Sequence, residues 1–97
     1  MANRTIRFKC SSGCKANPDP AHMDIGDTIT LEANGVDATI TFVKDSPFVS
    51  KTNPIYVANG KSDVQVVSDA ANGSFDYTLS CGSACQSSVN NPKMIVP

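Results

Sequence analysis

Four cysteines, arranged in two pairs of equal spacing, are the residues best suited to chemistry in this 97-residue chain. Cys10 and Cys14 form one C-x3-C pair, and Cys81 and Cys85 form the other. When oxidised, they would form two disulfides that brace a small domain. When deprotonated, the same four thiolates could bind zinc tetrahedrally. We expect two disulfides and no cofactor, with a four-thiolate zinc site as the alternative and four reduced, inert thiols as a third state.

The cysteine spacing leaves the pairing open. We favour the two local pairs, because Gly13 and Gly82 allow their short loops to bend. Pairs between the distant cysteines would remove more entropy from the unfolded chain and stay open as well. Zinc knuckles usually have C-x2-C spacing, and thiol oxidoreductases place C-x-x-C at a helix N-terminus. The spacing therefore supports zinc only weakly and argues against a redox enzyme.

His22, the chain's only histidine, stands in a stretch that also contains Asp19, Asp24 and Asp27. A base needs a nucleophile or a second titratable group placed beside it, and the sequence pairs none with His22. The aspartates lack the spacing of a calcium-binding loop. We expect a solvent-exposed loop histidine, turn-forming aspartates and no enzymatic activity.

The charge balance excludes two classes of partner. The formal net charge is −1, and no basic stripe is available to neutralise nucleic-acid phosphates. The sequence also lacks a basic amphipathic helix and an apolar run long enough to cross a bilayer. The expected partner is a protein or a small ligand, and the oligomeric state is not specified.

Apolar and polar residues alternate with a period of two along most of the chain, which predicts strands with one face in a core. The segments 55–57 and 94–96 add two short strands, and Asn-Gly and Asn-Pro turn signals separate the segments. The pattern predicts one all-β domain over residues 1–97, an antiparallel Greek-key β-sandwich of about seven strands. Residues 16–23 are expected to hold at most one helical turn, and Phe48 is expected in the core. The apolar positions predicted to face the core are Ile6, Phe8, Ile29, Leu31, Ile40, Phe42, Val64, Val66, Phe75, Tyr77 and Leu79.

Several of these segments resemble the cupredoxin family. Residues 18–31 contain a proline, alternating apolar residues and a Gly-Asp bend, as in an early cupredoxin strand. Residues 38–42 resemble the strand that begins with the first copper histidine, and residues 73–81 resemble the strand that ends in the copper cysteine. Residues 91–96 resemble the closing strand. The resemblance implies a cupredoxin-like sandwich from Pro18 onward.

The resemblance also implies where copper ligands would lie. A blue-copper site uses two imidazoles, a thiolate and usually an axial methionine. Ala38 stands in the place of the first imidazole, and the place of the second holds Ser83, Ala84 or Cys85. Only Cys81 matches, and Met94 is expected in the core. The domain is therefore expected to be cupredoxin-like without the blue-copper histidines.

By the same resemblance, the two cysteine-containing loops would meet at one end of the sandwich. The expected function is a non-catalytic module for binding or structural support. The alternative is a metal-binding protein with a zinc site at Cys10, Cys14, Cys81 and Cys85, and a degenerate electron carrier ranks last. Disulfides and a trimmed leader would mean export, whereas Met1 as the native start would mean a cytoplasmic protein.

Overall fold

The computed structural model describes residues 2–9, 15–17, 20–81 and 92–97. Strands are the only regular elements in these residues, and no helix that could cross a membrane is found among them. Nine strands are present in this part of the chain: β1 (Asn3–Lys9), β2 (Lys15–Asn17), β3 (Ala21–His22), β4 (Thr28–Asn34), β5 (Ala38–Phe42), β6 (Ile55–Val57), β7 (Ser62–Val66), β8 (Gly73–Ser80) and β9 (Lys93–Val96).

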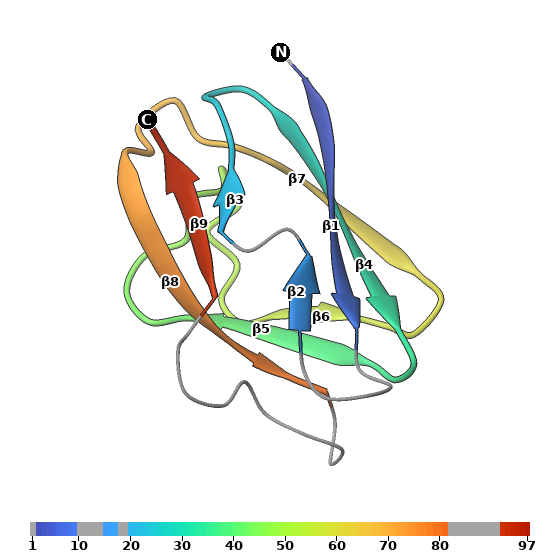
Figure 1. Cartoon of the computed structure of the whole chain (residues 1–97). Coiled ribbons are helices and arrows are strands. Elements are labelled where there is room, and N and C mark those ends of the chain that lie inside the picture. Colours follow the sequence, from blue (N-terminus) through green and yellow to red (C-terminus); the bar gives the residue numbers. More distant parts are fainter. Residues whose placement is uncertain (1, 10–14, 18–19, 82–91) are drawn as a thin grey trace.

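The strands form two sheets that pack face to face (Figure 1). One sheet has the order β2-β1-β4-β7, and the other has the order β3-β9-β8-β5-β6. Most neighbouring strands are antiparallel, whereas β1–β4 and β3–β9 are parallel pairs. The predicted all-β sandwich is confirmed, and its two sheets are mixed because the first and last strands each lie beside a strand of the same direction.

The segment 16–23, which is predicted to hold at most one helical turn, contains all or part of two short strands in its described residues. β2 pairs with the end of β1, and β3 pairs with β9, so each adds a strand to the edge of a sheet. The edge strand of a sheet has unpaired backbone N–H and C=O groups. An extended segment that lies beside it forms hydrogen bonds with these groups and satisfies its own backbone groups as well. These two strands account for the difference between the expected seven and the observed nine.

The prediction that Val64 and Val66 face the core is wrong. Both valines lie on the outer face of β7, with 57% and 44% of their surface exposed. The register with β4 places them opposite Thr30 and Thr28, which are also on the outer side. The inner positions of this edge strand hold Asp63 and Gln65, which hydrogen-bond to each other at 2.7 Å. A polar inner rim is tolerated there because the strand lies at the edge of the sheet.

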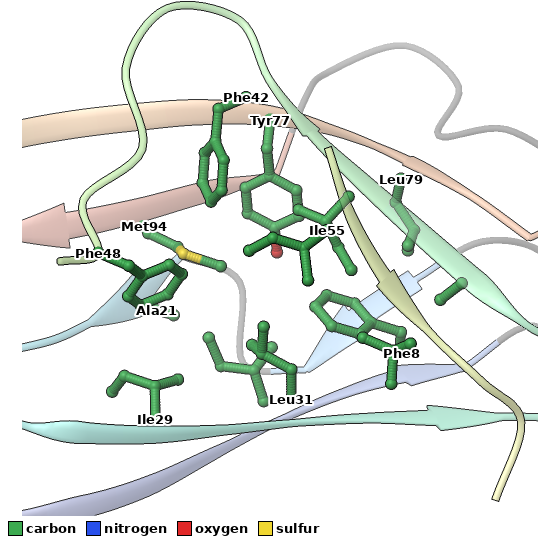
Figure 2. Close-up of a cluster of buried hydrophobic side chains, with 14 of the residues drawn as sticks. Phe8, Ala21, Ile29, Leu31, Phe42, Phe48, Ile55, Tyr77, Leu79 and Met94 are labelled. Atoms are coloured by element: carbon green, nitrogen blue, oxygen red, sulfur yellow. The ribbon is translucent and has the colours of Figure 1, made fainter. Parts of the chain in front are cut away.

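The core lies between the sheets and contains an aromatic cluster (Figure 2). Phe8 of β1 meets Tyr77 of β8 edge to face, with ring centroids 6.3 Å apart. Phe42 contacts both Tyr77 and Phe48 in similar geometry. Edge-to-face contacts suit the charge distribution of aromatic rings. Phe48 and Met94 are fully buried, which confirms their prediction as core residues.

Replacement of Phe8 by alanine is expected to destabilise the protein by about 3–5 kcal/mol. The side chain is 0% exposed, so its removal loses buried apolar surface and leaves a cavity between the sheets. The loss is a large share of the roughly 5–15 kcal/mol that stabilises a typical domain. Urea unfolding measures the change.

Val64→Ala is the control, because this valine is more than half exposed. It should change the free energy of unfolding by no more than about 0.5 kcal/mol. Equal effects of the two substitutions would contradict the placement of Phe8 in the core.

Candidate functional site at the cysteine end

Strands β1, β4 and β8 all end on the same side of the sandwich, which we call the cysteine end (Figure 1). Cys81 directly follows β8 at this end, is fully buried, and carries no free thiol. Lys9, the last residue of β1, lies at the same end. Cys10, Cys14 and Cys85, together with Ser83 and Ala84, lie outside the described residues.

Ala38 and Cys81 lie beside each other at the cysteine end. Thr39 of β5 pairs with Ser80 of β8 in an antiparallel ladder. One further step of this register brings Ala38 opposite Cys81, and both side chains are buried. These are the two positions that the sequence resemblance assigned to an imidazole and a thiolate. The methyl group of Ala38 offers no donor atom to a metal.

The chain's single imidazole is far from Cys81. His22 of β3 pairs with Ile95, and Ile95 pairs with Ser74, which precedes Cys81 by seven residues along β8. At the strand rise of about 3.3 Å per residue, the separation along the sheet is roughly 20 Å. Met94, which pairs with Phe75, is at a similar distance. Neither side chain can complete a copper site at Cys81.

His22 is exposed, as predicted, but it lies in a two-residue strand and not in a loop. Its pairing with β9 explains the difference, because the short strand completes the edge of the second sheet. In the described part of the chain, no group of three His, Cys, Asp or Glu side chains is arranged to hold a metal ion.

Two loops at the cysteine end, residues 34–37 and 58–61, are tied together by hydrogen bonds; we call them the loop pair. The Asn59 side chain accepts a hydrogen bond from the Gly35 N–H at 3.0 Å. The Asn59 N–H donates to Asp37 at 2.8 Å, and the Gly60 N–H donates to the Ala33 carbonyl. Gly35 and Gly60 have φ values of 107° and 76°, which glycine adopts without strain. The loop pair is thus held in one conformation by its own contacts.

Two hollows flank the loop pair. One has a volume of about 510 Å³ and a polar lining that includes Glu32, Asn34 and Lys61. The other has a volume of about 380 Å³ and is lined by Asp37, Ala38, Thr39, Tyr56, Val57 and Ala58. Both are open to solvent and within the size range of small-molecule sites.

Sequence reasoning identified Asn34-Gly35 and Asn59-Gly60 as separate turns but missed their mutual contact. Tyr56 was also missed as a surface residue. The sequence did contain a pattern that predicts the exposure of Tyr56. This residue stands between Ile55 and Val57, two apolar residues that alternation assigns to the core. The middle residue of such a strand must point outward.

Asp24 and Asp27, two of the aspartates near His22 in the sequence, have a structural role at the opposite end of the sandwich. Asp27 is buried and accepts hydrogen bonds from the Ala2 N–H at 2.9 Å, the Arg4 Nε at 2.7 Å and the Asp24 N–H at 2.8 Å. These contacts fasten the start of β1 to the turn before β4. Asp24 is largely exposed, and Asp19 lies outside the described residues. The prediction that the aspartates form turns is confirmed for Asp24 and Asp27, since the Asp27 N–H donates to the Asp24 carbonyl.

The same contacts shift the titration of Asp27. Its pKa falls from 3.8 to about 2, first because of the hydrogen bond from the Ala2 backbone and then because of those from Arg4 and the Asp24 backbone. Each donor stabilises the carboxylate relative to the acid. The hydrogen bond to Asp27 in turn raises the pKa of Arg4.

Comparison with solved structures defines the fold class. The chain is similar to a reduced Cu(I) form of an amicyanin mutant, with a TM-score of 0.58 and 14% identity over 96% of this chain and 82% of that one. It is also similar to a chain of a heme-copper terminal oxidase dimer, with a TM-score of 0.55 and 14% identity over 98% of this chain and 65% of that one. The domain therefore has a cupredoxin-like fold.

No family model matches the sequence, and a comparison with curated proteins finds no significant match. The similarity of this chain to known proteins is thus a similarity of fold. The histidine content separates this chain from a blue-copper protein, because one imidazole cannot supply the two that such a site uses.

The Asp27 carboxylate should make stability depend on pH in the acid range. Because its folded pKa is lower than its unfolded value, its contribution is complete above pH 3.8 and is lost as the pH falls through about 2. Asp27→Asn should lower the Tm by several degrees at neutral pH, and the gap from the wild type should narrow as the pH falls. Thermal unfolding across this range measures the gap.

Asp24→Asn is the matched control, because its side chain is 65% exposed and its N–H to Asp27 remains. It should leave the Tm nearly unchanged. A constant gap between wild type and Asp27→Asn at every pH would contradict the assigned role of the carboxylate.

Proposed function

We propose that this domain is a non-catalytic β-sandwich module that recognises a ligand or partner through the loop pair at its cysteine end. The loop pair carries the proposal, because hydrogen bonds fix its shape and two hollows lie beside it. Binding residues are commonly placed on loops that a rigid scaffold holds. The buried aromatic core and the strand ladders supply that scaffold.

We propose no catalytic role for His22 or Asp27, because of where each of them lies. His22 lies on the far edge of the second sheet, roughly 20 Å along the strands from Cys81. The buried Asp27 is fully occupied by three hydrogen-bond donors that hold two chain segments together. Neither group faces a hollow at the cysteine end.

We further propose that two disulfides brace the cysteine end. The buried position of Cys81 and its lack of a free thiol support this proposal. A buried disulfide beside Ala38 would hold the end of β8 where a copper thiolate lies in a blue-copper protein. The resemblance to cupredoxins does not decide between local and long-range pairs.

The second candidate is a four-thiolate zinc site at the same cysteines. It is favoured by the number of thiols and by their common spacing, since zinc accepts four cysteine ligands. Electron transfer through copper ranks last, because the chain has one imidazole and because neither His22 nor Met94 lies near Cys81.

Intact mass spectrometry separates the two candidates. Under denaturing, metal-free conditions, reduction should raise the mass by about 4 Da, two hydrogens for each disulfide. The wild-type protein should show no zinc in native spectra. Four free thiols with one bound zinc would replace the disulfide proposal with the zinc site.

The recognition proposal predicts that Asn59→Ala weakens binding. The substitution removes the acceptor for the Gly35 N–H and loosens the loop pair, while the core stays intact. The wild-type protein is screened against an oligosaccharide array and a random peptide library. The strongest binder should lose about tenfold in affinity on substitution, equivalent to about 1.4 kcal/mol.

Asn3→Ala is the matched control, because Asn3 is an exposed residue at the opposite end of β1. It should leave the affinity unchanged. No binding in either screen, or equal binding by the wild type and the Asn59→Ala variant, would contradict recognition through the loop pair.

A further inference from the structure

Tyr56 is the most exposed large hydrophobic side chain in the described part of the chain, with 72% of its surface accessible. It points away from the core, because its neighbours in β6, Ile55 and Val57, are both buried. A tyrosine combines an apolar ring with a polar hydroxyl, which suits it to surface contacts. Such a contact would form on the outer face of the second sheet, beside the loop pair.

The side chains beside Tyr56 on this face carry hydroxyl groups. Thr39 pairs with Tyr56 on one side and with Ser80 on the other, which places all three in one row across β6, β5 and β8. Thr41 and Thr78 form the next row on the same face. Residues two apart along a strand share a face, so the five side chains form one continuous surface, which we call the hydroxyl face.

Tyr56 and Thr39 also line the smaller hollow, together with Asp37. One oxygen of the Asp37 carboxylate accepts the Asn59 N–H at 2.8 Å, so the loop pair fixes its position. A carboxylate has capacity for further hydrogen bonds. The hollow thus combines a ring face, a hydroxyl and an anchored acceptor within about 380 Å³.

This composition distinguishes the hydroxyl face from a protein-docking surface. The core of a protein interface is apolar and closely packed. The exposed valines Val49, Val64 and Val66 gather instead at β7, in the other sheet, where the Val49 N–H donates to Val66. Tyr56 stands beside the hydroxyl groups of Thr39 and Ser80, and another exposed apolar side chain near this face is Val43, two residues after Thr41.

We propose that Tyr56, Thr39 and Asp37 bind a pyranose ring of an oligosaccharide. One face of a pyranose presents C–H groups that can stack on the tyrosine ring, and its edge presents hydroxyls for Thr39 and the Asp37 carboxylate. The hydroxyl face continues from the hollow across β5 and β8, so neighbouring sugar units have polar groups along their path. This inference rests on the proposed binding function and names its ligand class.

Tyrosine fluorescence provides a direct readout, because the chain has no Trp and only two Tyr. Tyr77 is fully buried, so a change on titration reports Tyr56. The probes are hexasaccharides of β-linked glucose, β-linked N-acetylglucosamine and β-linked mannose. At least one should change the fluorescence with saturation, and calorimetry should give the same dissociation constant.

Variants then locate the site. Tyr56→Ala should weaken binding at least about tenfold in calorimetry, as expected for loss of a central aromatic contact. Tyr56→Phe keeps the ring and should bind within about threefold of the wild type. Thr39→Ala should weaken binding several-fold. Its matched control, Thr30→Ala, changes a half-buried threonine on the outer face of the other sheet and should have no effect.

The outcomes separate this inference from the proposed function. Sugar binding that survives Tyr56→Ala, or failure of all three hexasaccharides, would overturn the sugar site. If peptides bind instead and Asn59→Ala weakens them, the recognition module stands with a different ligand. If neither oligosaccharides nor peptides bind, both proposals fail.

Discussion

The contact between Phe8 and Tyr77 joins the two sheets at the centre of the core, with ring centroids 6.3 Å apart and planes at 85°. A sandwich is stable only if each sheet buries one face against the other. Phe8 stands one residue before the end of β1, and Tyr77 precedes Cys81 by two steps along the inner side of β8. The aromatic contact therefore joins the two sheets close to the cysteine end.

The two ends of the sandwich are stabilised by different interactions. At one end, the buried Asp27 carboxylate ties the start of β1 to the turn before β4 through three hydrogen bonds. At the cysteine end, the Asn59 side chain and the Asp37 carboxylate tie one loop to another. The cluster around Asp27 is therefore structural, whereas the loop pair borders the hollows.

Cys81, which the sequence resemblance places where a blue-copper thiolate would lie, is buried directly after β8. Ala38 precedes Thr39, which pairs with Ser80 next to Cys81, and the chain's imidazole is on a distant edge. The buried residues around Tyr77 and Phe48 form a continuous core. The recognition site that we propose uses the polar surfaces beside the loop pair and the exposed ring of Tyr56.

Alternation in the sequence by itself determined the sandwich and the burial of Phe8 and Tyr77, and the count of histidines determined the lack of two copper imidazoles. These follow from side-chain period and residue count, which depend on no distant contact. Tertiary structure decided the outward direction of Val64, the pairing of β2 and β3, and the joining of Asn59 to Gly35. Each depends on which strand or loop lies next to a segment far away in the chain, and local patterns carry no information on that neighbour. The surface around Tyr56 depends on both the sequence and the tertiary structure. Alternation in the sequence directs the ring outward, and the strand register places the hydroxyl groups of Thr39 and Ser80 in the same row.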